Sequence, residues 1–388
     1  MSRLKNFLLV ALFGMFILCL MPKTRAVDII DLGVFGGTSS SARAVSDDGR
    51  VVVGSYRDTS GLSRAFKWDS INGMKDLGTL GGSTVASDVS ADGKVIVGSS
   101  FNGTNYQAVK WALEDEMQEL GSNGLYSRAE GVSADGSTII GTTSNPSRTA
   151  FSWTSDTGIH LFLPPNNITY SNAYGVSANG DVIVGSYYVS TPSGGPGPFI
   201  LYRWDSINGI QSLGNLGGRY SYALAVSGDG SIVVGESSNS LGLAHAVRWT
   251  AERGLEDLGA LGGPQAQSWA SDISSDGKII VGLSENNNSV RTGFVVGTDG
   301  IMRSLNAVLN YQKVSGISSW TSLDSINSIS GNELTGYNLV GSGTKNGQTS
   351  NFLVKGLIST VPEPNTYALA TITSGVLAYL ARQKRQST

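Results

Sequence analysis

A unit of about 45 residues recurs along most of this chain and restricts its possible folds more than any other feature. In the second copy the unit contains DLGTLGG, ASDVSADG, VIVG and AVKW, over residues 76–82, 86–93, 95–98 and 108–111. An Asp-Gly or Asn-Gly pair recurs at Asp48-Gly49, Asp92-Gly93, Asp135-Gly136, Asn179-Gly180, Asp229-Gly230 and Asp276-Gly277. The successive glycines of these pairs are 44, 43, 44, 50 and 47 residues apart, and a seventh, degraded copy covers residues 329–332, 339–341 and 352–354. A fixed period of this length indicates a solenoid or a propeller.

Each copy of the unit predicts four short strands. The first strand ends in Val-Ser before the Asp-Gly pair, whose residues tolerate positive φ and so favour a tight hairpin. The second strand is an apolar run that ends in a glycine, which we expect to permit a β-bulge or a close backbone contact. The third strand carries Ala-Phe/Val-x-Trp, and the fourth is the Asp-Leu-Gly segment. With 51 glycines and only 15% charged residues, the composition is typical of many short strands joined by tight turns.

The two ends of the repeat array complement each other. Residues 28–33 (DIIDLG) form a fourth strand without the three that should precede it, and the last copy has three strands but no fourth. Counting fourth strands gives seven, around Leu32, Leu77, Leu120, Leu161, Leu213, Leu258 and Leu305. We therefore predict an all-β fold, a seven-bladed propeller of four-stranded blades in which the N-terminal strand joins the last blade and closes the ring. Six or eight blades, or an open β-solenoid, are the alternatives.

The first 26 residues have the pattern of a signal peptide. Arg3 and Lys5 precede an apolar run over residues 7–20, and small residues favour cleavage after Ala26. A retained N-terminal anchor is the alternative. The only cysteine, Cys19, lies in this segment, and bulky Leu18 before it disfavours a lipoprotein. A mature chain would then have no cysteine for a disulfide, a metal site or a thiol nucleophile.

The C-terminus carries a second targeting pattern. Val361, Pro362, Glu363 and Pro364 precede an apolar stretch over residues 366–381, which is followed by the basic residues Arg382, Lys384 and Arg385. This order resembles the PEP-CTERM sorting signal of Gram-negative bacteria, over about 28 residues. The resemblance implies a helix that anchors the protein transiently in the inner membrane, processing by an exosortase, and then display on the cell surface or in the extracellular or biofilm matrix. A plain C-terminal membrane anchor is the alternative. The expected organisation is a signal peptide (1–26), a propeller (27–358) and a sorting tail (359–388).

The repeats over roughly residues 28–355 resemble the HAF family of extracellular repeat proteins. That family is named for a His-Ala-Phe motif on the predicted third strand. Only His245-Ala246-Val247 keeps the histidine here, and the other copies read Arg64-Ala65-Phe66, Gln107-Ala108-Val109 and Thr149-Ala150-Phe151. The histidine is therefore no catalytic group common to the blades, and the resemblance implies an extracellular location rather than an activity.

The sequence contains no recognisable catalytic or cofactor motif. Its two histidines, His160 and His245, are interpreted as strand residues, and it has no Gly-x-Ser-x-Gly elbow, phosphate loop or His-Glu-x-x-His. Each Asp-Gly turn offers too few oxygens for calcium, and the Ser-x-Asp-Gly order does not match the sialidase Asp-box. Loss of the first 26 residues changes the formal net charge from −3 to −7, which disfavours nucleic-acid binding. We expect no enzymatic activity, no cofactor and no metal.

Positions that vary between copies while the scaffold repeats are the best candidates for a binding site. When the first strands are aligned, the positions two and four residues before the conserved Val or Ile share a face, near the expected central channel. They supply Arg43, Arg128, Glu130, Tyr174, Tyr222 and Trp269. Aromatic, arginine and glutamate side chains suit a sugar chain, although packing between blades is an alternative role. The sequence thus predicts an exported, non-catalytic surface or matrix scaffold that binds polysaccharide or another surface protein. The alternatives are a purely structural envelope protein, and a propeller glycan hydrolase or lyase with acidic residues converging on the channel.

Overall fold

The computed structural model describes residues 27–34, 37–112, 116–121, 125–144, 147–162, 168–190, 196–285, 288 and 290–358. The predicted signal peptide and sorting tail lie outside these residues. Among the residues that the structure does describe, no helix is both long and apolar enough to cross a membrane.

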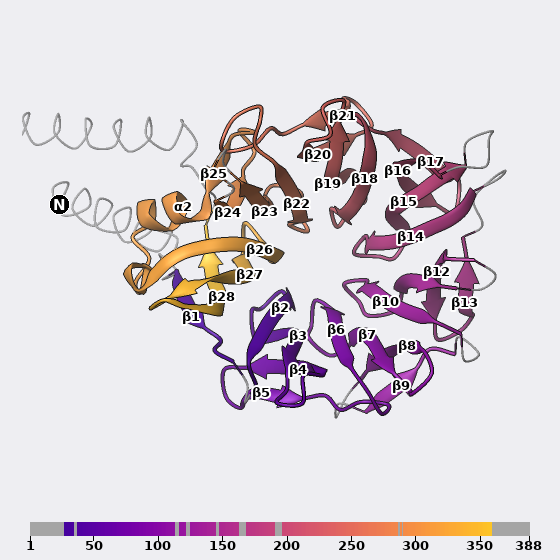
Figure 1. The fold of residues 1–388 in the computed structure, drawn as a ribbon, viewed down its shortest axis with the longest axis horizontal. Coiled ribbons are helices and arrows are strands. Elements are labelled where there is room, and N and C mark those ends of the chain that lie inside the picture. The colour runs from indigo at the N-terminus through magenta and orange to yellow at the C-terminus, as the bar shows by residue number, and fades with distance from the viewer. Residues whose placement is uncertain are drawn as a thin grey trace, which may run out of the picture.

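Seven four-stranded antiparallel sheets are arranged around a central axis, which confirms the predicted seven-bladed all-β propeller (Figure 1). Blade 1 contains β2 (Ser39–Val45), β3 (Val51–Arg57), β4 (Ser63–Asp69) and β5 (Gly73–Asp76). Blade 2 contains β6 (Thr84–Val89), β7 (Ile96–Phe101), β8 (Tyr106–Trp111) and β9 (Met117–Glu119). Blade 3 contains β10 (Ser127–Val132), β11 (Ile139–Thr143), β12 (Thr149–Thr154) and β13 (Gly158–Leu161).

The remaining blades follow the same order, with the first strand of each nearest the axis. Blade 4 contains β14 (Ile168–Val176), β15 (Val182–Ser190), β16 (Pro196–Asp205) and β17 (Gly209–Gly214). Blade 5 contains β18 (Gly217–Val226), β19 (Ile232–Asn239), β20 (Ala244–Thr250) and β21 (Gly254–Asp257). Blade 6 contains β22 (Ser268–Ile273), β23 (Ile280–Glu285), β24 (Arg291–Val296) and β25 (Met302–Ser304). Blade 7 contains β26 (Trp320–Asn332), β27 (Gly336–Lys345), β28 (Gln348–Leu357) and β1 (Asp28–Asp31).

The N-terminal strand β1 supplies the outermost strand of blade 7. It pairs antiparallel with β28, with Asp28 opposite Lys355 and Asp31 opposite Phe352 (Figure 1). The Asp31 carboxylate accepts hydrogen bonds from Lys345 Nζ at 2.9 Å and Ser350 Oγ at 2.5 Å, and Leu32 just beyond β1 is buried. Segments from the two ends of the described chain therefore share one sheet.

The Asp-Gly turns are held by their own side chains. In blade 1, Ser46 Oγ donates to Asp48 Oδ1 at 2.8 Å and accepts the N–H of Val51 at 3.0 Å, while Asp48 Oδ1 also accepts the N–H of Arg50. Gly49 has a φ of +64°, which an L-residue rarely adopts. The same hydroxyl-to-turn contact recurs at Ser90, Ser133, Ser177, Ser227 and Ser274. One oxygen of each Asp or Asn side chain is thus engaged in holding its turn.

A β-bulge interrupts the inner strand of every blade, at the position two residues before the conserved Val or Ile. The glycine of the second strand faces this bulge. A Cβ on Gly98 would lie 2.0 Å from the carbonyl oxygen of Val85, and the glycines in the other six blades are equally confined. The expectation that this glycine permits a bulge and a close backbone contact is confirmed.

Backbone hydrogen bonds join neighbouring inner strands around the axis. They run from Asp47 N–H to Ala91, from Ala91 to Ala134, from Ala134 to Ala178, from Ala178 to Gly228 and from Gly228 to Ser275, at 2.9–3.1 Å. At blade 7, side chains take part instead. Asp272 Oδ2 accepts the N–H of Ile329, and Asp47 Oδ1 accepts the N–H of Gly331.

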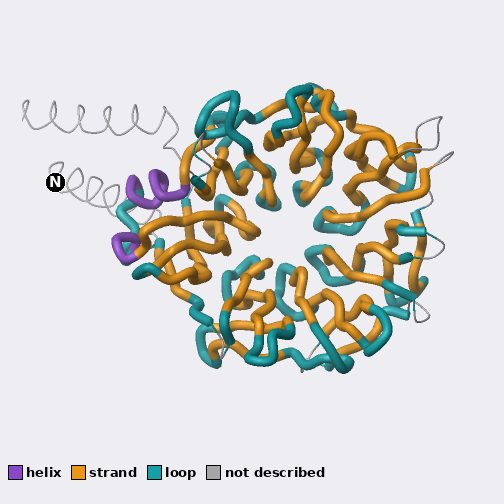
Figure 2. The backbone as a smooth tube through the Cα atoms, viewed as in Figure 1, coloured by secondary structure: helices purple, strands orange, loops and turns teal. Residues whose placement is uncertain are grey.

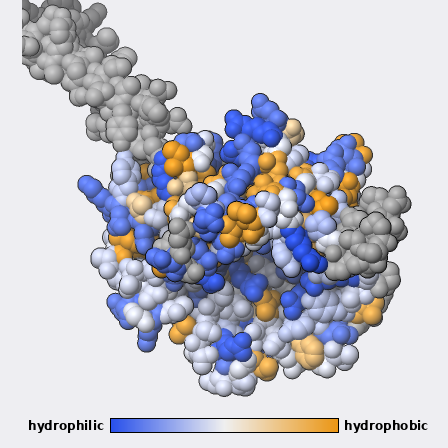
Figure 3. Space-filling model, turned by 45° about the horizontal axis from the view of Figure 1, so that its top comes forward, coloured by the Kyte–Doolittle hydropathy of each residue, from blue (hydrophilic) through white to orange (hydrophobic). Residues whose placement is uncertain are grey.

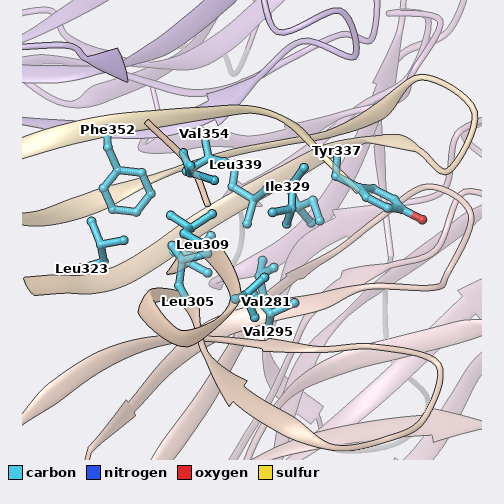
Figure 4. Packing of buried hydrophobic residues seen from close by; sticks show 14 of the residues in the cluster. Val281, Val295, Leu305, Leu309, Leu323, Ile329, Tyr337, Leu339, Phe352 and Val354 are labelled. Carbon is cyan, nitrogen blue, oxygen red and sulfur yellow. The ribbon is translucent and has the colours of Figure 1, made fainter. Parts of the chain in front are cut away.

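The connection from blade 6 to blade 7 departs from the repeat. The predicted fourth strand around Leu305 is confirmed as β25, which ends at Ser304, but Leu305 then begins the helix α2 (Leu305–Tyr311), which the sequence pattern did not predict. Ser304 caps this helix by accepting the N–H of Ala307. A short 3₁₀ helix, η2 (Ile317–Ser319), follows before β26. The helix lies at the rim of the ring, beside β25 and β26 (Figure 2). Leu305 and Leu309 of α2 pack into a buried cluster with residues of both blades, including Val281, Leu323 and Leu339 (Figure 4).

Candidate binding site at the channel mouth

The inner strands of all seven blades line a central channel. At the level of the strand ends next to the Asp-Gly turns, the channel holds a cavity of about 260 Å³ to which every blade contributes residues. A second cavity of about 340 Å³ lies nearer the first residues of the inner strands and is lined by Ser41, Arg43, Ser87, Glu130, Ser271 and Asn327. We call this end of the channel, which is opposite the Asp-Gly turns, the channel mouth. The oblique view in Figure 3 shows the molecule hollowed at its centre, with hydrophilic and hydrophobic residues interspersed around the hollow.

Three of the six predicted binding residues lie on the channel wall, and each is the extra residue of a bulge. Arg43 comes from β2, Glu130 from β10 and Tyr174 from β14. Because a bulged residue has no partner on the neighbouring strand, its side chain is free to project into the channel. The bulge therefore explains why the residue two positions before the conserved Val or Ile reaches the channel.

The other three predicted residues lie closer to the start of their strands. Tyr222 contacts Tyr174 across the boundary of blades 4 and 5, with ring centroids 6.3 Å apart. Arg128 lies two residues before Glu130, and its charge lowers the pKa values of both Glu130 and Arg43. Trp269 is half-buried on β22, and among the described residues no hydrogen bond, ring pair or cation–π contact joins it to the other five. The structure thus brings together five of the six predicted residues.

Arg128 is held between aromatic rings. Its guanidinium lies 4.7 Å from the centroid of Tyr106 and 5.6 Å from that of Tyr126. Its buried Nε has no hydrogen-bond partner. Stacking on aromatic faces fixes the plane of a guanidinium while its N–H edges remain available.

Arg148, just before β12, was not predicted from the sequence but belongs to the same site. Its guanidinium lies 5.0 Å from the Tyr170 centroid, and its Nε donates to Asn172 Oδ1 at 3.0 Å. Asn172 Oδ1 also accepts a hydrogen bond from Thr142, which is the cross-strand partner of Arg128. The network thus joins Arg148 to Thr142 of β11, and Thr142 lies opposite Arg128 of β10.

Glu130 is a single carboxyl group among three arginines. Burial raises its pKa above the ordinary value, while the positive charges of Arg128, Arg43 and Arg148 act in the opposite direction. Arg43 is exposed to water in the channel but surrounded by protein, and this desolvation lowers its pKa, against the effect of Glu130. No carboxylate oxygen lies within 4 Å of these three guanidinium groups among the described residues.

An aromatic platform extends from the mouth over blades 4 and 5, and consists of Tyr170, Tyr188, Phe199, Tyr220 and Tyr222. Tyr170 lies 5.3 Å from Tyr188 and 5.8 Å from Phe199 between ring centroids. Phe199 lies 5.3 Å from Tyr222 and stacks on Tyr220 at 6.2 Å with an interplanar angle of 26°. Tyr220 is 53% exposed, so the platform reaches the surface.

Two signals in the sequence could have indicated this platform. Residues 170–222 hold seven of the 14 tyrosines, and the longest glycine spacing, 50 residues, separates Gly180 from Gly230. The extra length is used in the long hairpin of β15 and β16, which carries Tyr188 and Phe199.

Glu236 on β19 adds a carboxyl group beside the platform. It is the cross-strand partner of Tyr222, and burial raises its pKa to about 7. Its Oε2 is buried without a hydrogen-bond partner. Other blades have mostly serine or threonine at this position, as at Ser55, Ser99 and Thr142. Glu236 was not predicted because only the first strands of the copies were aligned, and Glu236 lies on the second strand.

Two further acids, Asp88 and Asp272, line the cavity of about 260 Å³. Burial raises the pKa of Asp88 to about 7 and that of Asp272 to about 6. Each accepts an N–H from the next residue of its own strand and one from the following blade: Val132 N–H lies 2.9 Å from Asp88 Oδ2, and Ile329 N–H lies 2.9 Å from Asp272 Oδ2. Both acids therefore serve as links between blades.

The two histidines lie away from the mouth, on the outer strands. His245 Nδ1 lies 2.8 Å from Asp257 Oδ2, between β20 and β21. His160 packs edge-on against Phe162 in a pocket lined by blades 3 and 4. Among the described residues, no group of three or more His, Cys, Asp and Glu side chains could hold a metal ion.

Comparison with models of protein families gives no match, and comparison with curated protein sequences gives none either. Several solved structures have a similar fold. The β-propeller domain of the Trilobed protease from Pyrococcus furiosus has a TM-score of 0.54 at 11% identity, over 88% of this chain and 99% of that one. A puromycin hydrolase has a TM-score of 0.52 at 11% identity, over 79% of this chain and 51% of that one. TolB from Acinetobacter baumannii has a TM-score of 0.45 at 17% identity, and the matched region spans 66% of this chain and 63% of TolB. At these identities, the similarity to the β-propeller domain of the Trilobed protease and to the puromycin hydrolase concerns the fold alone.

Proposed function

We propose that this protein is an exported, non-catalytic scaffold of the bacterial surface or extracellular matrix that binds polysaccharide at the channel mouth. The observation that carries the proposal is the convergence of Arg43, Arg128, Glu130, Tyr174 and Tyr222, which lie up to about 180 residues apart in the sequence. They meet at one end of the channel, beside the aromatic platform. The residues that recur in every copy build the blades, whereas the residues at these alignment positions differ from one copy to the next.

A sugar chain suits this surface better than a folded partner protein does. Tyrosine presents an apolar face together with a hydroxyl group, so it can stack on a sugar ring and form hydrogen bonds at the edge. The mouth also offers charged groups that fix orientation within a concave site. Because the rings of Phe199 and Tyr220 are stacked, their positions are set before a ligand arrives.

The test of this proposal is binding to a glycan array by the purified protein. We expect the double variant Tyr174→Ala/Tyr222→Ala to lose binding. Trp249→Ala is the matched control, because Trp249 is a half-buried aromatic residue of β20 that lies at the Asp-Gly end of blade 5, away from the mouth. Unchanged binding by the double variant, with an unchanged melting temperature, would remove the proposed site.

Export and sorting form the second part of the proposal and are supported by the terminal patterns. We propose cleavage after Ala26 and recognition of the tail around Val361, Pro362, Glu363 and Pro364 by an exosortase, after transient anchoring in the inner membrane. The intact mass of the protein recovered outside cells of an exosortase-bearing host tests this. A mass that retains residues 1–26 and 359–388 would contradict it.

A purely structural envelope role is the second candidate. It is favoured by the fact that several mouth contacts cross blade boundaries, such as Tyr174 to Tyr222 and Arg128 to Tyr106. In that role the mouth variants would lose stability without losing any ligand. The melting temperature measured beside the binding assay separates the two candidates.

We also propose that the pairing of β1 with β28 closes the ring of blades.

A further inference from the structure

We propose that the polysaccharide is anionic, with its carboxylate groups bound by Arg43, Arg128 and Arg148 while its sugar rings lie on the aromatic platform. This inference rests on the proposed function and narrows it to one class of ligand. The observation that supports it is that these three arginines have no carboxylate within ion-pair distance among the described residues.

The three mouth arginines differ from the paired arginines elsewhere in the protein. Arg64 contacts Asp58 at 2.8 Å, Arg248 contacts Glu256 at 3.0 Å and Arg303 contacts Asp299 at 2.7 Å. At the mouth, the described residues place no carboxylate within the same range of Arg43, Arg128 or Arg148. Arg128 is partly buried, and Arg43 and Arg148 are exposed. Three positive charges gathered at a concave site, with no acidic partner within ion-pair distance in the described part of the chain, point to an anion supplied from outside.

The protein itself holds Arg128 and Arg148 in place for such an anion. The ring of Tyr106 lies against Arg128, and that of Tyr170 lies against Arg148. Within the described part of the chain, the one hydrogen bond of the Arg148 side chain is to a neutral acceptor, Asn172 Oδ1. A guanidinium fixed in this way presents two parallel N–H groups, which match the two oxygens of a carboxylate.

The balance of charge at the mouth is positive, although the chain as a whole is acidic. Three guanidinium groups surround Glu130, whose ionised form burial disfavours. The formal net charge of the whole chain is −3. A local positive potential in a concave site concentrates anions and increases their association rate.

The aromatic platform decides between a sugar chain and an acidic peptide. The guanidinium of Arg148 lies over the ring of Tyr170, and that ring contacts Phe199. Phe199 in turn contacts Tyr220 and Tyr222. The rings thus form a continuous path from the arginines to the exposed Tyr220. A chain of uronic acids offers ring faces for the platform and a carboxylate on each sugar for the arginines.

The experiment compares polygalacturonate oligomers with their methyl esters, which share a backbone but lack the charge. Binding of both to the purified full-length protein is measured by calorimetry at low and moderate salt. We expect the acid form to bind at least about tenfold more tightly than the ester, as charge-assisted hydrogen bonds are lost on esterification. Salt should weaken the binding of the acid form only.

Variants test whether the preference for the acid over the ester arises at the channel mouth. Arg128→Gln/Arg148→Gln should bind the acid and the ester alike, whereas Arg303→Gln, which removes a paired arginine elsewhere, should keep the preference. If the double variant melts at a lower temperature, Arg148→Gln alone is used, since Arg148 precedes β12 and interrupts no strand. Its preference should fall by several-fold.

Distinct outcomes separate this inference from the function on which it rests. Equal binding of acid and ester by the wild type overturns the anionic ligand but leaves polysaccharide binding intact. Binding of dextran sulfate but not dextran supports an anionic ligand, with a sulfate in place of the carboxylate. Tighter binding of polyglutamate than of polygalacturonate overturns the inference in favour of an acidic peptide. Failure of every polysaccharide to bind contradicts the proposed function itself.

Discussion

The side chain of Asp88 in blade 2 accepts a hydrogen bond from the backbone N–H of Val132 in blade 3, at 2.9 Å. Asp272 makes the same contact from blade 6 to Ile329 of blade 7. In both cases a carboxyl group at the wall of the channel replaces the small residue found there in other blades, such as Ala44 or Ala225. These links make the stability of the ring depend on pH.

We predict that Asp88 contributes most to stability in acid. Its pKa in the folded protein is about 7, above the ordinary value of 3.8, because of burial. A group with a raised pKa binds more protons in the folded state, so its contribution is full below about pH 4 and is lost as the pH rises through 7. The free energy of unfolding of Asp88→Asn should therefore fall furthest below that of the wild type at pH 4. A difference that is constant from pH 4 to pH 8 would contradict this.

The bulge glycines should be intolerant of a single added carbon. Gly98→Ala places a Cβ 2.0 Å from the backbone oxygen of Val85, which no side-chain rotation relieves. We expect a loss of about 3 kcal/mol or more in urea unfolding. Gly103→Ala is the control, since its Cβ meets nothing within 4 Å and only its φ of +97° is unfavourable. That variant should lose about 1 kcal/mol. Equal losses would show that the bulge is not rigid.

The contribution of β1 can be measured with a matched pair of leucines. Leu32 follows β1 and is 7% exposed, and Leu77 occupies the equivalent position after β5 at 4%. If β1 is as firmly packed as the fourth strand of any other blade, Leu32→Ala and Leu77→Ala should each cost about 2–4 kcal/mol. A negligible effect of Leu32→Ala beside a large one of Leu77→Ala would mean that β1 detaches without consequence for the ring.

Glu236 should make ligand binding depend on pH. Its pKa of about 7 means that its carboxyl group is largely neutral at pH 5.5 and ionised at pH 8.5. A negative charge beside Tyr222 repels an anionic sugar chain, so polygalacturonate should bind more weakly at pH 8.5. Glu236→Gln should remove most of this change. A pH dependence that persists in Glu236→Gln would locate the titrating group elsewhere.

Much of the fold could be predicted from the sequence because the constraints are local and repeated. Asp-Gly pairs fix the hairpins, and the glycine of the second strand reports the bulge opposite it, as at Gly98. The N-terminal segment has a fourth strand without its blade, and the last copy lacks a fourth strand, so the pairing of β1 with β28 could be predicted. The helix α2 was missed because Leu305 follows the strand pattern closely, whereas the longer connection to blade 7 lets the chain form a helical turn there.

The site was only partly predictable, for a geometric reason. Arg43, Glu130 and Tyr174 could be identified because they share one alignment column, and the bulge directs that column into the channel. Trp269 came from the second alignment column, but no ring pair or hydrogen bond among the described residues joins it to the site. Arg148 and Glu236 come from other strands, and only packing between blades places them beside the predicted residues.

The most direct test of the account is a crystal structure of the protein with a galacturonate oligomer. The account predicts sugar rings on Tyr222 and Phe199, with a carboxylate about 3 Å from the guanidinium of Arg128 or Arg148. An oligomer bound at any other part of the surface, with the channel mouth occupied only by water, would contradict it.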